Sequence, residues 1–318
     1  MTNFLTQIAL LLLAVCGIAN AQAGDLRIAI TFDDLPWARL DSVVPAELAT
    51  QHDKLMAALE QSGVAGVGFV NEGKLESEGE LAPERVAMLR DWLDAGYELG
   101  NHTFGHVDLH AVGLEVYQAD ILRGETVLRP MLAERGQAPR WFRHPYLRAG
   151  RTTGDKAAVA EFLATHGYRI APVTVDNSDW IWARAYDEAR EREDEKLRAR
   201  LREEFVPYLI AKLDYFQAQS QALLGRTLPQ VLLLHANELN ADSFVALVEA
   251  IHARKYRVVA LEDVLADPAY QRPDGYTGAY GPSWIHRWAI ADGKPRDFFA
   301  GEPETPRWVM QLAGVESE

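Results

Sequence analysis

Two short polar motifs carry residue types that bind metal ions. Residues 31–34 (TFDD) place two carboxylates directly after an apolar run, and residues 101–106 (NHTFGH) contain two histidines four positions apart. Histidines with that spacing lie on one face of a helical turn. A carboxylate and two imidazoles can hold a divalent ion and leave positions for water and substrate. We therefore expect one of the two aspartates, together with His102 and His106, to bind a divalent metal, with Zn2+ preferred and Co2+ or Mn2+ as alternatives.

Three further polar motifs follow short apolar runs. They are residues 143–146 (RHPY), residues 176–180 (DNSDW) and His235. Singly, such motifs are weak evidence, because adjacent aspartates are common in turns and caps and paired histidines arise by chance. All five motifs, however, follow predicted strands of one parallel sheet, and the carboxyl ends of such strands meet at one edge. The coincidence indicates a catalytic site.

Strand-like runs alternate with helical patterns along the chain. The predicted strands are residues 27–32, 64–70, 97–100, 140–142, 168–173, 230–235 and 256–259. The predicted helices are residues 45–61, 83–95, 114–134, 155–166 and 241–253. Because parallel strands need crossover connections, this alternation predicts an α/β fold with a parallel sheet. Periodicity alone leaves open whether the sheet closes into a barrel or stays open and doubly wound.

Two segments fall outside the alternation. Residues 184–224 are rich in charge and carry an apolar stripe at four-residue spacing, which predicts an amphipathic helix bent or broken at Pro207. Residues 267–318 are rich in proline, glycine and aromatic residues. We expect this tail to wrap the core without forming a second domain.

Composition argues against several classes of protein. The chain has 318 residues, of which 48% are hydrophobic and 25% charged, values typical of an ordinary globular protein. Intrinsic disorder and a multi-span membrane protein are both poor fits. The formal net charge of −14 would repel phosphate backbones, so we expect no nucleic-acid partner.

The first 23 residues have features of a signal peptide. Residues 8–15 form an apolar run shorter than the about 20 residues that a transmembrane helix needs, and residues 21–23 (AQA) fit a cleavage site. The usual preceding basic residue is missing, and a buried N-terminal helix is the alternative. We expect cleavage after Ala23 and a mature domain of residues 24–318, periplasmic or secreted, without stable membrane insertion. Removal of Cys16, the only cysteine, would exclude cysteine nucleophiles and ligands.

Taken in order, the five motifs resemble those of the polysaccharide deacetylases, the fourth family of carbohydrate esterases, built on the NodB homology domain. The resemblance covers residues 27–265, and the insert 184–224 and the tail 267–318 have no counterpart in the family's minimal domain. It implies a distorted (β/α)7 barrel and a metal-dependent hydrolase. The implied substrate is an acetylated polysaccharide or cell-envelope glycan, cut at an N-acetyl or an O-acetyl group.

The resemblance also implies roles at the metal. Asp34, His102 and His106 would bind a metal that polarises the acetyl carbonyl and acidifies water. Asp33 would be the general base that takes the proton from that water. Arg143 would pair with Asp33 and tune its basicity, because a neighbouring cation favours the ionised carboxylate.

Further implied roles concern the leaving group and the substrate. His235 would be the general acid that protonates the leaving amine or alkoxide, held in place by Asp179. The backbone N–H of Tyr146 would help to stabilise the oxyanion, and Trp180 would form an apolar wall for the acetyl methyl group. Trp37 could stack on a sugar ring or serve in packing.

Some residues depart from the family pattern or stay ambiguous. Leu35 stands where the family has a glycine, so the loop beside the metal should differ in shape and the substrate is open. We expect His144 to be exposed to solvent, and Asp176 either to cap its loop or to assist the site.

Two other functions compete with deacetylation of a glycan. One is an amidase that acts on a small non-carbohydrate substrate. The other is a catalytically silent glycan-binding module, which is disfavoured because every base, acid and ligand position is filled.

Overall fold

A computed structural model describes residues 26–318 of the chain. The predicted signal peptide, its cleavage site and Cys16 lie outside these residues. Within the described part, no helix is long and apolar enough to cross a membrane.

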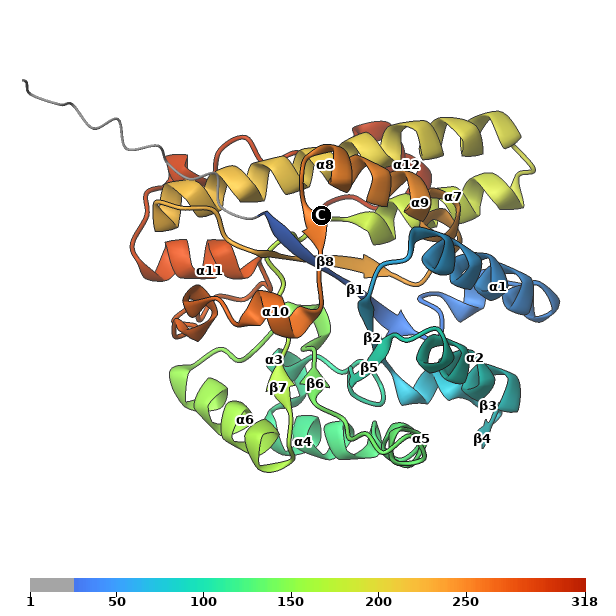
Figure 1. The fold of residues 1–318 in the computed structure, drawn as a ribbon, viewed down its shortest axis with the longest axis horizontal. Helices are drawn as coiled ribbons and strands as arrows, with labels where there is room; N and C mark the ends of the chain where they lie inside the picture. Colours follow the sequence, from blue (N-terminus) through green and yellow to red (C-terminus); the bar gives the residue numbers. More distant parts are fainter. Residues whose placement is uncertain (1–25) are drawn as a thin grey trace, which may run out of the picture.

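A curled sheet of parallel strands occupies the middle of the molecule (Figure 1). Its strands are β1 (Arg27–Leu35), β2 (Gly66–Val70), β5 (Glu98–Asn101), β6 (Trp141–Phe142), β7 (Arg169–Ile170), β8 (Gln230–His235) and β9 (Arg257–Val258). The spatial order is β7-β6-β5-β2-β1-β8, and β9 pairs with the start of β1. The seven predicted strands are thus confirmed. A separate antiparallel pair, β3 (Glu76–Ser77) and β4 (Glu80–Leu81), lies outside this sheet.

The chain that follows β7 closes the sheet. Val175 forms a parallel bridge with Leu232 of β8. Its N–H donates to the carbonyl of Val231 at 2.9 Å, and its carbonyl accepts from the N–H of Leu233 at 3.3 Å. This short seam joins the two ends of the strand order, as expected for a distorted (β/α) barrel.

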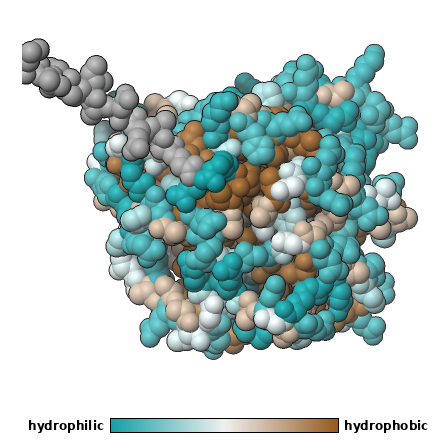
Figure 2. Space-filling view, in the orientation of Figure 1, coloured by the Kyte–Doolittle hydropathy of each residue, from teal (hydrophilic) through white to brown (hydrophobic). Residues whose placement is uncertain are grey.

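Helices surround the sheet (Figure 1). They include α1 (Pro45–Ser62), α2 (Pro83–Asp94), α3 (Leu109–Val112), α4 (Leu114–Arg123), α5 (Leu128–Ala133), α6 (Thr153–Thr165), α9 (Glu238–Ala253) and α10 (Leu261–Leu265). The short helices α3 and α10 were not predicted; apart from the division described next, the others match the predicted helices to within a few residues. In the orientation of Figure 1 the visible surface is mostly hydrophilic, with hydrophobic residues gathered toward its centre (Figure 2).

The helix predicted over residues 114–134 is divided in two at Gly124. A Cβ atom at Gly124 would lie 2.7 Å from the backbone of Thr103 and Phe104, so the chain needs glycine to pass this close. The buried carboxylate of Glu72 then accepts hydrogen bonds from the N–H groups of Val127 and Leu128. It thereby satisfies orphan donors at the start of α5.

The insert forms two helices, α7 (Asp179–Glu191) and α8 (Glu195–Leu224). Of the bend or break expected at Pro207, the break is excluded, because α8 continues through that proline. The chain turns instead just before Asp194, whose side chain caps α8 by accepting from the N–H of Leu197 at 3.0 Å. Phe205 and Leu209, on either side of Pro207, are buried, so packing compensates for the hydrogen bond that proline cannot make.

The tail packs onto the same core. It contains α11 (Trp284–Ala291) and α12 (Arg307–Ala313), and its buried residues Ile285, Trp288 and Val309 belong to the hydrophobic cluster that includes β1 and α9. Helix α11 packs against α8, and α12 packs against α7 (Figure 1).

Candidate active site

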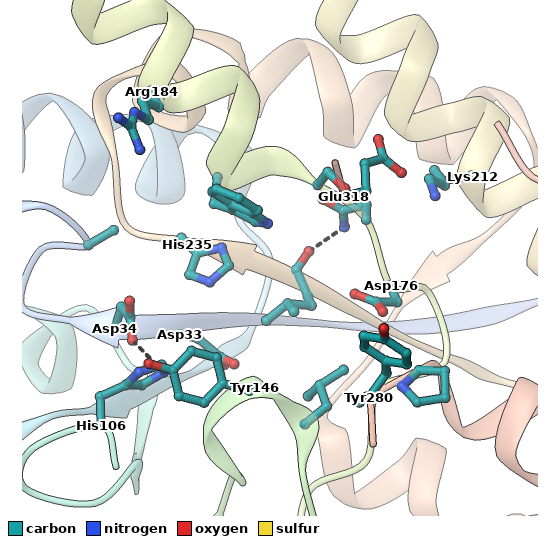
Figure 3. A pocket seen from close by; sticks show the side chains of 18 of the residues that line it. Asp33, Asp34, His106, Tyr146, Asp176, Arg184, Lys212, His235, Tyr280 and Glu318 are labelled. Carbon is teal, nitrogen blue, oxygen red and sulfur yellow. Dashed lines mark hydrogen bonds and ion pairs between the residues drawn. The ribbon is translucent and has the colours of Figure 1, made fainter. Parts of the chain in front are cut away.

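Asp34, His102 and His106 converge where β1 and β5 end. Each offers one ligand atom, and these atoms all lie within 4.8 Å of one another. Asp34 Oδ1 is 3.6 Å from His102 Nε2 and 3.5 Å from His106 Nε2. Figure 3 shows Asp34 and His106 together at one end of a pocket.

The hydrogen bonding of this cluster fits a cation. His102 Nδ1 lies 2.8 Å from the carbonyl oxygen of Arg143, so Nδ1 carries the proton and Nε2 keeps its lone pair. Burial holds the pKa of His102 well below its ordinary value, so the ring is neutral. Burial acts to raise the pKa of Asp34, but Lys74 and nearby histidines outweigh it and lower that pKa. Asp34 Oδ1 is buried without a hydrogen-bond partner, and an ionised carboxylate facing neutral imidazoles suits a divalent ion such as zinc.

The backbone that presents these groups is strained. The φ angle is 70° at Asp34, 52° at His106 and 56° at Tyr146. Such left-handed conformations cost about 1–3 kcal/mol each in residues other than glycine, and they cluster at functional sites. Thr103 is also left-handed, with φ of 64°, so His102 and His106 converge through a loop. The helical turn expected for these two histidines was wrong.

Asp33 pairs with a fully buried arginine. Arg143 Nη1 donates to both carboxylate oxygens of Asp33, at 3.1 and 3.2 Å. The other guanidinium nitrogens are fixed by Thr31 Oγ1 at 3.1 Å and the carbonyl of Ala171 at 2.7 Å. Burial raises the pKa of Asp33 to about 6, against the opposing charge of Arg143. A carboxylate with a pKa near neutrality is suited to accept and release a proton.

His235 and Asp179 form a second charged pair. His235 Nδ1 donates to Asp179 Oδ1 at 2.6 Å. Asp179 Oδ2 accepts from the backbone N–H of His235 and from Asn240 Nδ2, each at 2.8 Å. Burial opposes protonation of His235, but the charge of Asp179 outweighs it and raises the pKa of His235 to about 9. His235 is therefore a proton donor at neutral pH, and it lies directly beside Asp33 in the register of β1 and β8.

These groups open into one pocket of about 670 Å³. Strand-end residues line one end of it, and Trp180 and Arg184 of α7, Lys212 of α8 and residues 280–282 of the tail line the rest. The pocket thus gathers all five polar motifs and both segments outside the alternation. Among known proteins, the family model for polysaccharide deacetylases matches residues 20–168.

Residues 20–168 of this chain thus match the polysaccharide deacetylase family. Among curated relatives, it is 25% identical over 154 residues to a peptidoglycan-N-acetylglucosamine deacetylase of Bacillus cereus, covering 48% of this chain and 46% of that protein. It is 26% identical over 153 residues to a chitin deacetylase of Pestalotiopsis sp, covering 48% and 43%. The match therefore spans less than half the length of these curated relatives.

Solved structures of carbohydrate esterase family 4 are distantly similar to this chain. A family 4 carbohydrate esterase from Streptomyces lividans, in complex with acetate, has a TM-score of 0.46 and 20% identity, covering 75% of this chain and 95% of the other. A pseudoenzyme of the same family from Bacillus anthracis has a TM-score of 0.48 and 15% identity, covering 77% and 67%.

The structure decides between the two roles considered for Trp37 and corrects the expectation for His144. Trp37 is 2% exposed and belongs to the hydrophobic core, so no face of its ring is available to a sugar. His144, expected in solvent, is buried and accepts a hydrogen bond from the hydroxyl of Tyr117 at 2.9 Å. Burial lowers the pKa of His144 to about 3. Trp180 and Tyr146 remain half exposed at the pocket.

Other polar residues of the site escaped the sequence analysis. Lys74 Nζ lies 3.2 Å from Asp34 Oδ2, and it follows β2, the predicted strand that carries no motif. Asn240, which holds Asp179, could have been noticed because it follows His235 by only five residues. Glu302, a pocket residue in the tail, carries no local signal.

Proposed function

We propose that this protein is a metal-dependent deacetylase that removes acetyl groups from a glycan. The observation that carries the proposal is the buried, unpartnered Asp34 Oδ1 facing two imidazoles, beside the Asp33–Arg143 and His235–Asp179 pairs. The similarity of half the chain to peptidoglycan and chitin deacetylases favours the N-acetyl group of an amino sugar. An O-acetyl ester is the alternative bond.

Asp34, His102 and His106 would hold the divalent ion, with zinc preferred for this carboxylate and imidazole set. A bound ion there would supply Lewis-acid polarisation of the acetyl carbonyl and acidify water.

The chain's own residues move the protons. Asp33 accepts a proton from the attacking water, and Arg143 keeps that carboxylate oriented through two hydrogen bonds. The N–H of Tyr146 donates to the oxyanion that develops on the acetyl group. His235, held by Asp179, donates its proton to the leaving nitrogen or oxygen.

Acetate release by the purified protein tests this proposal. We expect release from N-acetylglucosamine oligomers or from acetylated xylan, loss of release with a chelator, and recovery with added zinc. The polymer that is hydrolysed decides between amide and ester. Asp33→Asn should retain zinc but lose activity by about 10²–10⁴-fold, the usual contribution of a general base. A protein that binds zinc and glycan but releases no acetate would be a binding module.

An amidase acting on a small molecule is the second candidate. The pocket volume of about 670 Å³ favours it, because small-molecule sites span about 300–1,000 Å³. Turnover of small N-acetylated amines with no turnover of any saccharide would support it.

We also propose that the protein is exported to the periplasm or secreted, by removal of residues 1–23. N-terminal sequencing of the native protein should begin at Gly24. A native N-terminus at Met1 in the cytosolic fraction would contradict export.

A further inference from the structure

One end of the pocket is built from segments beyond the region that matches the family. Lys212, Tyr280, Glu302 and Glu318 line it, whereas the family model matches only residues 20–168. We call these four residues the far wall. Figure 3 shows Lys212, Glu318 and Tyr280 on the side of the pocket opposite Asp34 and His106.

The part of the far wall contributed by residues 280–283 is fixed in place. A Cβ atom at Gly281 would lie 1.8 Å from the carbonyl oxygen of Tyr146, so this chain passes directly against the loop after β6. The hydroxyl of Ser283 donates to the carbonyl of Thr174 at 2.7 Å. These contacts tie the segment to the ends of β6 and β7, so it is a constant part of the pocket and not a lid.

A buried arginine secures the same segment. Arg287 is 1% exposed and donates to the carbonyl oxygens of Pro282, at 2.9 Å, and Leu147. It also pairs with Asp274 at 2.9 Å. A charged side chain is this deeply buried only where it is fully paired, so the tail is anchored beside the pocket at a specific position.

An ion pair joins the insert to the tail across the far wall. Lys212 Nζ of α8 lies 2.7 Å from Glu302 Oε1, and Lys212 is only 3% exposed. The ammonium of Lys212 is thus held in the wall by a carboxylate from another segment. The insert and the tail therefore meet here, on the side of the pocket away from Asp34 (Figure 3).

The volume of the pocket is that of a small-ligand site. A volume of about 670 Å³ lies within the about 300–1,000 Å³ typical of sites that enclose small ligands. A polymer bound through its interior needs free passage on both sides of the sugar that reacts. On the side of Lys212 and Glu302, such a chain would have to pass through the ion pair that joins them.

From this arrangement we infer that the substrate ends inside the pocket: the protein acts on the terminal sugar of a glycan chain or on a short oligosaccharide, and the Lys212–Glu302 pair sets the limit. This inference rests on the proposed deacetylase function. It assigns to the insert and the tail the selection of chain ends over chain interiors.

The position of deacetylation along defined oligosaccharides tests the inference. Chito-oligosaccharides of increasing length, isotopically labelled at the reducing end, are incubated with the zinc-loaded full chain and sequenced by mass spectrometry. O-acetylated xylo-oligosaccharides are treated in parallel. We expect loss of acetyl groups at one chain end whatever the length. Loss at internal positions would overturn the inference while leaving the deacetylase function standing, whereas no acetate from any saccharide would overturn the proposed function itself.

Shortening the far wall gives a second readout. The double variant Lys212→Ala/Glu302→Ala should move the modified position inward and raise the rate on long relative to short oligomers, on the order of tenfold. The matched control is Asp214→Ala/Arg254→Ala, an exposed pair that also includes a residue of α8. An unchanged position in a folded Lys212→Ala/Glu302→Ala variant would show that this pair sets no limit. If that variant fails to fold, the positions modified by the unaltered chain still decide.

Discussion

The carboxylate of Asp179 holds His235 at two points, the ring Nδ1 at 2.6 Å and the backbone N–H at 2.8 Å. Asp179 opens α7, and His235 ends β8. The pair therefore fixes the orientation of the imidazole and supplies the charge that keeps it protonated. The substitution Asp179→Asn keeps the shape of this side chain but removes its negative charge, so it tests what the charge contributes.

Asp179→Asn should lower the pKa of His235 from about 9, because burial keeps acting while the largest opposing charge is removed. A general acid must carry its proton, so the alkaline limit of kcat should move down in pH. At pH 8 we expect a loss on the order of 10²-fold. The pH–rate profile measures this, with Asp94→Asn, an exposed change at the end of α2, as control.

The His235–Asp179 pair should make the folded protein less stable as the pH rises. The pKa of His235 in the folded state lies above its unfolded value, so its contribution is full below about pH 6.5 and is lost as the pH rises through about 9. Asp179→Asn should flatten this decline in thermal midpoints. An unchanged decline would mean that another group causes it.

Zinc should stabilise the protein against heat through Asp34, His102 and His106. At a free concentration about 100 times Kd, binding to the folded state alone contributes about 2.7 kcal/mol. His106→Gln should remove most of this gain in thermal midpoint. His252→Gln, an exposed histidine at the end of α9, should keep it. Equal gains in both variants would place the zinc elsewhere.

Two tryptophans should respond oppositely to truncation. Trp37→Ala should cost about 3–5 kcal/mol in the free energy of unfolding, because the ring is buried in the core. Trp180→Ala should change stability little, since that residue is 42% exposed, but should raise KM for acetylated substrate. Denaturant unfolding and steady-state kinetics measure the two effects. A stable Trp37→Ala variant with a raised KM would restore the sugar-stacking role considered from the sequence.

Asp176→Asn should stabilise the protein at alkaline pH. Burial raises the pKa of Asp176 to about 7, with Lys212 opposing. Because this pKa lies above the unfolded value, stability is lost as the pH rises from about 4 to about 7. The amide resembles the neutral carboxyl, so the advantage of the variant in thermal midpoint should grow over that range. Greater stability of the unaltered protein at pH 8 would mean that Lys212 requires the ionised carboxylate.

The sheet could be predicted because its signals are local. Short apolar runs bounded by glycine and polar residues predicted all seven strands, and the motifs after them predicted which side chains meet at the pocket. Pro207 shows the limit of such signals, because the packing of α8 overrides the intrinsic tendency of proline to end a helix.

Details of the site depended on contacts between distant segments. The loop geometry of His102 and His106 follows from left-handed residues, and Gly124 of the following helix packs against that loop. Nothing in the local sequence distinguishes a buried Trp37 from an exposed one. Lys74 approaches Asp34 only because β1 and β2 are neighbours. The contact between Lys74 and Asp34 could therefore not be predicted from the sequence.

The short seam at Val175, between the chain after β7 and β8, links the stability of the fold to the proposed catalysis. Few backbone hydrogen bonds join the chain after β7 to β8, and polar side chains supplement them: Asn177 donates to the carbonyl of Leu233 at 2.7 Å, and Asp179 accepts from the N–H of His235. The groups that would orient the general acid also fasten the barrel. A substitution along this seam should therefore change both the thermal stability of the protein and the pH optimum of its activity. Engineering one of these properties here should alter the other.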